Sequence, residues 1–431
     1  MKYNTHQPVL YRIFLMFVAT LFFSNVTRAQ TDTLELKLAQ AEKLFLDSNL
    51  YLLASHYNVD VNKAYIKQAK LWDNPVLITD QSIYANGHVL EHGKDENGQP
   101  TGQFFIQVQQ LIKTAGKRRK LIDLATTNVK ISELQLQQVM LNLRYQLRQD
   151  YYTIAVALHN NELYQSQLEQ LNHLQNAMKA QLDAGNIALK DYLRIQALVI
   201  SLQQDIADLG RSIIDAESDL KTLLHFNDNQ FIKPLEKIQT DITLTVNKDV
   251  VFDSAKQNNP NYLLQQTQVL YQKQNLAYQK ALRSPDVTLG PEYDHNSNYA
   301  PYYVGLTVSL PLPLLNKNQG NIAAAGYSIK QQQALATQAE TELKNNVDNA
   351  YQKLVLSINQ SSATQNQFYE SYGNIFNKMM ESYRQKQVSL LEFLDFFDAY
   401  KEAELRLQQQ HLNLQLAKEE LNYQAGADLI K

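Results

Sequence analysis

One segment decides how this chain folds: Thr307-Val-Ser-Leu-Pro-Leu-Pro-Leu-Leu-Asn-Lys-Asn-Gln-Gly-Asn-Ile322. Apolar and polar residues alternate before Pro311, which is typical of a β-strand. Pro311 and Pro313 stop such a strand because proline has no backbone N–H to donate to a sheet. Asn318 and Gly320 follow, and no proline occurs from there to the end of the chain. The segment therefore predicts a strand that leads into a very long helix.

The same plan occurs earlier in the chain, where the segment Phe104-Phe-Ile-Gln-Val-Gln-Gln-Leu-Ile-Lys-Thr-Ala-Gly116 precedes another long helical stretch. Displacing the sequence by 210 positions aligns Asn49–Leu53 with Asn259–Leu263. A displacement of 201 positions aligns Gly185–Leu193 with Lys386–Leu394. Two blocks matched in the same order indicate an internal duplication.

The duplication predicts two repeats of one order: helix, strand, strand, long helix, long helix. The predicted layout is a signal peptide at residues 1–29, a first repeat at 30–224 with strands near 75–86 and 103–112 and helices near 113–182 and 188–224, a linker at 225–248, and a second repeat at 249–425 with strands near 285–295 and 301–311 and helices near 320–384 and 389–424.

Composition and the N-terminal segment place the chain outside the cytoplasm. Lys2 and Arg12, the apolar run from Ile13 to Phe23, and Thr27-Arg28-Ala29 have the pattern of a cleavable signal peptide. The alternative is a retained membrane anchor. No other apolar stretch is long enough for a transmembrane helix. The 431 residues include no cysteine, and 43 acidic residues against 40 basic ones give no indication of nucleic-acid binding.

The predicted strands have one apolar and one small or polar face. In the second repeat Tyr302, Val304, Leu306, Val308 and Leu310 share a face. A transmembrane barrel needs this pattern, although an ordinary half-buried sheet produces it too. About four strands per chain cannot close a barrel, and open strand edges are not tolerated in lipid. A membrane-spanning version must therefore share its barrel among several chains.

The long helices carry two apolar stripes instead of one. Leu134, Leu141 and Tyr145 lie on one side of their predicted helix, and Leu143 and Leu147 lie nearly opposite. A surface helix of a globular protein has a single stripe toward its core. Two opposed stripes predict a helix with neighbours on both sides, as in a closed wall of helices.

Helical walls and shared membrane strands together suggest a tube, and the residues resemble the TolC family of outer-membrane efflux ducts. The resemblance covers nearly all of the chain after the signal segment. It rests on the duplicated order, on the block Gly185–Asp191 with its partner Val388–Asp395, and on Pro311–Ile322. That last motif is similar to a signature of the heavy-metal branch, which exports copper and silver or cobalt, zinc and cadmium.

The resemblance implies a homotrimer in the outer membrane of a Gram-negative bacterium. Its fold would be mainly α, with a 12-stranded membrane β-barrel continuing into a periplasmic α-helical barrel. The implied partners are outer-membrane lipid, a periplasmic adaptor (membrane fusion protein) and an inner-membrane pump of the resistance-nodulation-division type. The duct would be no enzyme and would need no cofactor.

Both breaks between long helices are expected at the periplasmic tip, and Gly185 suits one of the two turns because glycine tolerates a positive φ. The resemblance implies that Glu392 and Asp395 ring the pore entrance, where three copies of each favour cations. Mutual repulsion is expected to raise some of their pKa values. The alternative is that both acids only complement the helix dipole.

The resemblance also implies a latch in which Asp191 bonds Tyr383 on a neighbouring tip helix. A second family latch lacks its arginine, because Val388 occupies that position. The alternative for Asp191 is again an acid in the first turn of a helix.

Metal ligands are weakly indicated by His88 and His92, which flank Glu91 in a predicted outer loop. Exposed loop histidines are more often simply polar. Phosphate loops, nucleophile elbows and His-x-x-x-His helices are missing from the sequence, which argues against an enzyme. Other possibilities are a multidrug or type I secretion duct of the same fold and, in a different class, a soluble periplasmic coiled-coil scaffold or adaptor.

Overall fold

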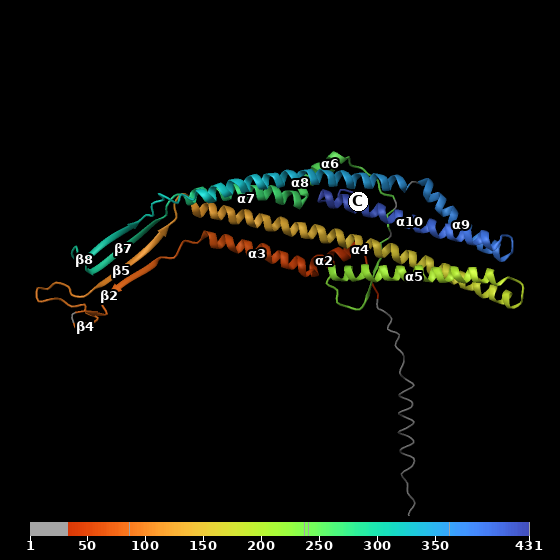
Figure 1. Ribbon diagram of the computed structural model, residues 1–431, viewed down its shortest axis with the longest axis horizontal. Coiled ribbons are helices and arrows are strands. Elements are labelled where there is room, and N and C mark those ends of the chain that lie inside the picture. Colours follow the sequence, from red (N-terminus) through yellow and green to blue (C-terminus); the bar gives the residue numbers. More distant parts are fainter. Residues whose placement is uncertain (1–32, 86, 237, 240, 362, 431) are drawn as a thin grey trace, which may run out of the picture. The chain divides into compact units, whose positions relative to one another are not determined.

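The computed structural model describes residues 33–85, 87–236, 238–239, 241–361 and 363–430 (Figure 1). The predicted signal peptide therefore lies outside the described residues. The elements in chain order are β1 (Thr33–Leu36), α2 (Leu38–Ser48), α3 (Leu50–Lys70), β2 (Val76–Gln81), β3 (Tyr84–Ala85), β4 (His88–Val89), β5 (Phe104–Ile112), α4 (Lys117–Asp183), α5 (Leu189–Leu223), β6 (Phe231–Pro234), α6 (Lys248–Asn258), α7 (Pro260–Leu282), β7 (Val287–Asn296), β8 (Pro301–Ser309), α8 (Gln319–Gln360), α9 (Ala363–Arg384) and α10 (Leu390–Ala425).

The two halves of the chain share a basic order of strand, two helices, two sheet strands and two long helical stretches, although β3 and β4 occur only in the first half. Asn49 and Asn259, which the displacement by 210 aligns, play the same part in both halves. Each is the N-cap of a helix, α3 or α7, and accepts a hydrogen bond from a backbone N–H of the first turn. Side-chain oxygens at this position satisfy N–H groups that have no partner within the helix. The duplicated asparagine therefore starts equivalent helices.

The sequence predicts one continuous helix in the second repeat where the structure has two. The stretch 320–384 forms two helices, because α8 ends at Gln360 and α9 begins at Ala363. Ser361 ends α8 with a ψ of 41°, outside the helical range. Two successive serines occur here in the sequence, and serine disfavours a helix interior because its hydroxyl competes for nearby backbone groups. The equivalent helix of the first half, α4, has 67 residues without a break, which corresponds to about 100 Å of helix.

The chain divides into two compact units that differ from the two sequence repeats. Among the described residues, the first unit contains 33–45 and 153–236, and the second contains those of 46–152 and 238–430. In the first unit, β1 and β6 pair in parallel, so the predicted linker contributes a strand that the sequence did not reveal. Leu36 and Ile232 of this pair are buried.

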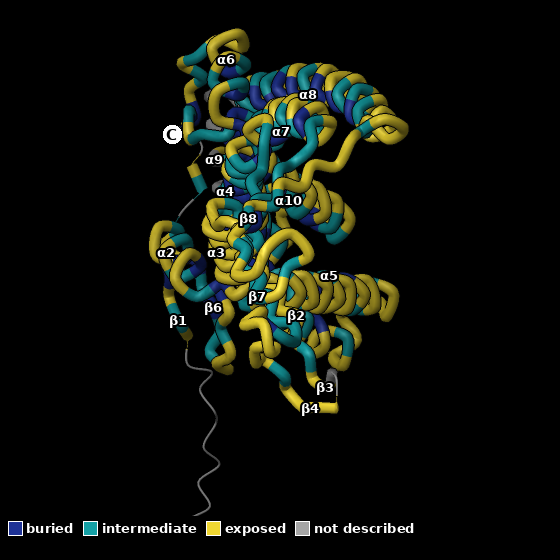
Figure 2. Tube along the Cα trace, turned by 90° about the vertical axis from the view of Figure 1, so that its left-hand side faces the viewer, coloured by how far each residue is buried: buried dark blue, intermediate teal, exposed yellow. Residues whose placement is uncertain are grey.

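The second unit has a hydrophobic core between α6, α8 and α10. Buried positions of α8 recur three, four or seven residues apart, as on one face of a helix, and exposed positions lie between them (Figure 2). The buried side chains of this core are Ile242, Val251, Ala255, Leu343, Val347, Ala350, Leu354, Leu414, Ala417, Leu421, Ala425 and Ile430. Several are alanines, which let the helix backbones approach closely. The core therefore holds three helices together at one level of the bundle.

Strands of both repeats form one antiparallel sheet in the second unit, in the order β2-β5-β7-β8. The centre of this sheet is the pair β5 and β7, so each repeat contributes two adjacent strands. In the part of the chain that is described, no helix is both long and apolar enough to cross a membrane.

Candidate functional site

The four-stranded sheet has a polar face. Gln107 lies opposite Glu292, and its Nε2 donates to Glu292 Oε2 at 2.6 Å and to Thr307 Oγ1 at 2.9 Å. The Thr307 hydroxyl lies 2.6 Å from the same carboxylate oxygen, and Gln109 Nε2 donates to Gln107 Oε1 at 2.6 Å. A hydrogen-bonded network of this kind keeps polar side chains in fixed positions on three neighbouring strands.

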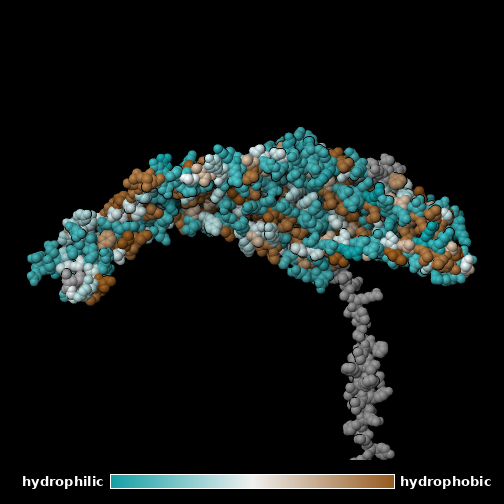
Figure 3. Space-filling view, in the orientation of Figure 1, coloured by the Kyte–Doolittle hydropathy of each residue, from teal (hydrophilic) through white to brown (hydrophobic). Residues whose placement is uncertain are grey.

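The opposite face of the sheet is apolar and exposed. On β8, the exposed fractions are 75% for Val304, 62% for Leu306 and 60% for Val308. Figure 3 shows hydrophobic side chains gathered along the strands and beside the start of α8. A monomeric soluble protein rarely exposes a continuous apolar surface of this kind. Within the described sheet, β2 and β8 each pair on one side only, so both edges are open.

A buried ion pair fixes the junction between β5 and α4. Lys117 is 4% exposed, and its Nζ lies 2.6 Å from Asp286 Oδ1 and 2.6 Å from the Ser284 carbonyl oxygen. The backbone N–H of Thr114 also donates to Asp286 Oδ1, at 2.8 Å. Sequence reasoning missed this pair, because Lys117 opens a basic run that resembles a solvated surface. Asp286 immediately precedes β7, so the pair connects the two central strands where they leave the sheet.

Asn318 fixes the equivalent junction between β8 and α8. It is the N-cap of α8 with a φ of 58°, and its Nδ2 donates to the carbonyl oxygen of Gln279 on α7 at 2.8 Å. Pro311 and Pro313 lie between β8 and α8. Gly320 is open to solvent, whereas Gly116 has a φ of 67° in the β5–α4 turn. Leucines between the prolines and Asn318 are exposed: Leu312, Leu314 and Leu315.

The two turns between long helices have the same geometry. After α4, Gly185 N–H donates to Leu182 O and Asn186 N–H to Gln181 O, both at 2.9 Å. After α9, Lys386 N–H donates to Tyr383 O at 3.0 Å and Gln387 N–H to Ser382 O at 2.8 Å. This is the Schellman arrangement, which places one residue in the left-handed region. Gly185 has a φ of 73° and Lys386 a φ of 59°.

Exchanging the residues at these two positions is expected to have opposite effects on the turns. Lys386→Gly removes the cost of a left-handed β-carbon and should stabilise its turn by about 1 kcal/mol. Gly185→Ala adds that cost and should destabilise its turn by about 1–2 kcal/mol. Hydrogen–deuterium exchange measures both effects: protection of the Gln387 amide should rise, and protection of the Asn186 amide should fall. Equal signs in the two variants would contradict this interpretation.

Glu392 has a structural role at the start of α10. Its Oε2 accepts a hydrogen bond from the Ser389 backbone N–H at 2.7 Å, and its own N–H donates to Ser389 Oγ at 3.3 Å. This is a capping box. Donation by the Ser389 backbone, followed by that of its hydroxyl, lowers the pKa of Glu392. Within one chain the pKa of Glu392 is therefore lowered, whereas repulsion in a ring of acids is expected to raise it. Asp395 lies three residues on, and both carboxylates are exposed on one face of α10.

The two predicted latch residues belong to different compact units. Asp191 lies in the first turn of α5, whose N-cap Ala188 makes no side-chain capping bond. Tyr383, in the last turn of α9, stacks its ring on Phe393 of α10, with centroids 5.1 Å apart and an interplanar angle of 21°. This stacking joins α9 to the first turn of α10. The latch itself stays a prediction.

The weak metal prediction for His88 and His92 is not supported. Among the described residues, no group of three or more histidine, aspartate or glutamate side chains is placed to hold a metal ion. His92 instead packs edge-to-face on Phe104, with centroids 6.0 Å apart. His88 is an exposed residue of β4. A metal site at His88 and His92 stays a prediction.

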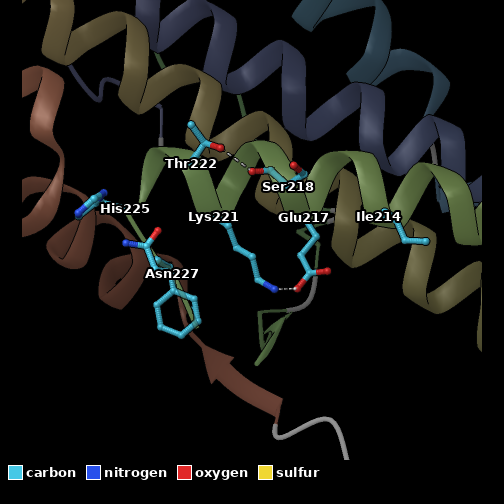
Figure 4. Close-up of a pocket in the computed structure, with 8 residues that line it drawn as sticks. Ile214, Glu217, Ser218, Lys221, Thr222, His225 and Asn227 are labelled. Carbon is cyan, nitrogen blue, oxygen red and sulfur yellow. Dashed lines mark hydrogen bonds and ion pairs between the residues drawn. The ribbon is translucent and has the colours of Figure 1, made fainter. Parts of the chain in front are cut away.

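A surface hollow in the first unit lies beside the last turns of α5 (Figure 4). Lys221 Nζ lies 2.8 Å from Glu217 Oε1, and the same carboxylate oxygen accepts from the Ile232 backbone N–H of β6 at 3.2 Å. The Thr222 hydroxyl donates to the Ser218 carbonyl oxygen. The bond from Ile232 attaches β6 to α5, and the other two contacts lie within α5, so Glu217 has a structural role here.

Comparison with known proteins agrees with this geometry. The model of a family described as outer membrane efflux protein matches residues 21–224. The cobalt-zinc-cadmium resistance protein CzcC of Cupriavidus metallidurans is 22% identical over 331 residues, which cover 76% of this chain and 73% of that protein.

Solved structures share the fold over nearly the whole length. A membrane protein from Pseudomonas aeruginosa superposes with a TM-score of 0.74 at 14% identity, covering 92% of each chain. CusC, whose structures are described in terms of transmembrane channel formation, superposes with a TM-score of 0.73 at 15% identity, covering 94% of this chain and 96% of that one. These likenesses confirm the predicted fold class.

Proposed function

We propose that this outer-membrane protein, whose residues 21–224 match the outer membrane efflux protein family, is the passive duct of a tripartite efflux system. An inner-membrane pump of the resistance-nodulation-division type supplies the energy, and a periplasmic adaptor docks at the turns between the long helices. The duct binds no cofactor and performs no chemistry. It provides a route from pump to exterior that opens and closes at those turns.

The sheet is the observation that carries the duct proposal. It combines an exposed apolar face, a hydrogen-bonded polar face and two open edges at β2 and β8. Open edges cannot remain in lipid, because unpaired N–H and C=O groups have no water to bind there. Three chains that pair β8 of one with β2 of the next close a 12-stranded barrel. The apolar face then contacts lipid and the polar face lines the lumen.

Divalent metal cations are the substrates that we propose. CzcC, the relative named for cobalt, zinc and cadmium resistance, supports this choice. The polar face of the sheet carries Asp80, Glu292 and Asp294, and the strands β2, β5, β7 and β8 contain no lysine or arginine. A lumen with only acidic charge attracts cations and repels anions.

Complementation tests the substrate. The gene should restore tolerance to cobalt, zinc or cadmium in a strain that retains a metal pump and adaptor but lacks their duct. Dye and detergent tolerance in a strain lacking a multidrug duct should stay unchanged. Rescue of dye tolerance alone would identify a multidrug duct and overturn the metal proposal. Recovery of the wild-type protein as a soluble monomer would overturn the duct itself.

Neutralising the proposed acidic ring is expected to reduce cation selectivity. Glu392→Gln retains an oxygen that can accept from the Ser389 N–H, so it removes charge while keeping the capping box. Combined with Asp395→Asn, it removes six carboxylates from a trimer. In planar bilayers under a salt gradient, the reversal potential of the double variant should move toward zero.

Glu402→Gln is the matched control for this experiment. Glu402 is an exposed acid further along α10 that pairs with Arg406. Its neutralisation should leave the reversal potential unchanged. Equal shifts in the control and the double variant would indicate a general charge effect and contradict a selective ring at Glu392 and Asp395.

A further inference from the structure

Trp72 lies at the boundary between the helices and the membrane sheet. It follows α3 and precedes β2, and it is 60% exposed, as is the neighbouring Leu71 at 59%. It is the only tryptophan in the chain. Tryptophan favours membrane–water interfaces, where its apolar ring meets lipid and its N–H meets the headgroups.

Basic side chains surround this exposed ring. The Arg118 guanidinium lies over the Trp72 ring, with its central carbon 4.5 Å from the ring centroid. Arg118 Nη2 donates to the Lys70 carbonyl oxygen at 2.5 Å, which fixes the orientation of the guanidinium over the ring. Arg119 is exposed beside it. A guanidinium held in one orientation beside a second, exposed arginine is well suited to attract a phosphate group.

These side chains line a single hollow of about 310 Å³, formed by Leu71, Trp72, Asp73, Lys113, Arg118, Arg119 and Ile122. Lys113 Nζ lies 3.1 Å from Asp73, which neutralises the one acid of the hollow. The charge left over is therefore positive, and it comes from the two arginines. One side of the hollow is apolar and the other is cationic, as a lipid headgroup with its first acyl carbons requires.

The hollow is continuous with the lipid-facing side of the sheet. Gln110 shares the face of β5 that carries Val108, and its Nε2 donates to the Asp73 carbonyl oxygen at 2.9 Å. Lys113 directly follows β5. The hollow thus borders the apolar face at the end of the strands from which the long helices extend. In the proposed duct this end meets the periplasmic leaflet of the outer membrane.

The duplication argues that the hollow is not required by the fold. The displacement by 210 places Ala281 and Leu282 where the first half has Leu71 and Trp72. Ala281 is 6% exposed and Leu282 is 37% exposed. The second repeat makes the same helix-to-strand transition without an exposed aromatic ring. The helix-to-strand transition therefore does not require an exposed ring. Trp72 is better explained by a binding partner that contacts the first repeat only.

We propose that Trp72, Arg118 and Arg119 bind the phosphate-bearing headgroup of a phospholipid in the periplasmic leaflet, with anionic headgroups preferred. The site rests on the proposed membrane duct, since it needs the sheet to lie in lipid. Each trimer carries three such sites, at one level around the barrel. They fix the depth of the barrel and hold the β5–α4 junction at the membrane surface.

Fluorescence of the single tryptophan tests this site directly in the full-length trimer. The protein is reconstituted in phosphatidylcholine vesicles, with and without phosphatidylglycerol, that contain lipids brominated near the carbonyl or near the chain end. Trp72 emission should be quenched more strongly by the shallow bromine, and phosphatidylglycerol should shift it to shorter wavelength. Arg118→Gln/Arg119→Gln should lose that shift, while Lys130→Gln, an exposed lysine further along α4, should retain it.

Flotation separates failure of this site from failure of the duct. Vesicles that float with the protein while Trp72 remains unquenched would overturn the headgroup site and leave the duct intact. Protein that does not float with vesicles would overturn both. An equal emission shift caused by inorganic phosphate in detergent would indicate a soluble anion site and overturn the lipid assignment. Retention of the phosphatidylglycerol shift in the double arginine variant would overturn the role of the arginines.

Discussion

Arg148→Met is expected to lower the free energy of unfolding of the second unit by about 3 kcal/mol, because it leaves a buried carboxylate without its main partner. Arg148 Nη1 lies 2.5 Å from Glu419 Oε2 and 2.8 Å from Asp428 Oδ1. The side chains of Arg148 and Glu419 are only 12% and 3% exposed. Lys418 Nζ remains 3.4 Å from Glu419 in the variant, which places the cost at the lower end of the usual range.

This ion pair also holds residues 428–430 against the helices of the second unit. Asp428 accepts from Arg144 at 2.6 Å as well as from Arg148, and Asn422 Oδ1 accepts from the backbone N–H groups of Leu429 and Ile430. Ile430 is 3% exposed and belongs to the core between α6, α8 and α10. Loss of Arg148 should therefore expose the amides of residues 428–430 to hydrogen exchange. Denaturation of the detergent-solubilised protein, followed by circular dichroism, measures the loss of stability.

The same network predicts a dependence on pH. Burial acts to raise the pKa of Asp428, but hydrogen bonding and charge from Arg148, and then from Arg144, outweigh it and lower the pKa. A carboxyl group whose pKa is lower in the folded state stabilises the fold at pH values above its unfolded-state pKa of about 3.9. That stability is lost as the pH falls through the folded-state pKa. The wild type should therefore lose this stability below about pH 4, and Arg148→Met should lose less of it.

Arg406→Met is the control for both measurements. Arg406 pairs with Glu402 at 2.5 Å, but their side chains are 70% and 63% exposed. Exposed pairs contribute at most about 0.5 kcal/mol in a helix. A loss at Arg406 as large as that at Arg148 would show that burial does not determine the cost, and would contradict the prediction.

Gly426→Ala is expected to destabilise the second unit by about 2–5 kcal/mol through strain and overpacking together. Gly426 ends α10 with a φ of 68°. A β-carbon there would lie 2.7 Å from the Asn258 carbonyl group and 2.8 Å from the Asn259 nitrogen. Asn259 Nδ2 also donates to the Gln424 carbonyl oxygen at 3.0 Å, which holds the two segments together. The backbone between α6 and α7 cannot move away without breaking that bond.

Gly185→Ala provides a matched comparison, because Gly185 has nearly the same φ in the same kind of turn, but nothing lies within 4 Å of an added β-carbon. The difference between the two alanine variants isolates the steric clash, since the backbone cost is common to both. Thermal unfolding of both proteins in one detergent gives that difference. Equal losses of stability would show that backbone strain alone accounts for Gly426.

Local patterns predicted those parts of the molecule that depend on local chemistry. Alternation and prolines predicted the four strands of the main sheet, and the duplication predicted the order of elements in both halves except for the break between α8 and α9. Aligning Gly185 with Lys386 also located two turns of identical hydrogen bonding. In these cases the residues that decide the structure lie within a few positions of one another.

Contacts between distant residues were not predictable in this way. Lys117 is buried because Asp286 lies next to it, and nothing around Lys117 in the sequence reveals that partner. Likewise β6 exists because β1 lies beside it. For Glu392 the local pattern supplied one role, capping, while a role in a ring depends on other copies of the chain. Single-sequence reasoning is weakest where an interaction joins separate elements or separate molecules.

The parallel pairing of β1 with β6 has a consequence for the timing of export. A chain exported N-terminus first delivers Thr33 near the beginning of translocation, but its partner Phe231 arrives only after α4 and α5 have followed. Closing so long a loop costs conformational entropy and slows folding. Until β6 emerges, β1 is an unpaired edge strand. The first unit is thus completed only after more than half of the polypeptide has crossed the inner membrane.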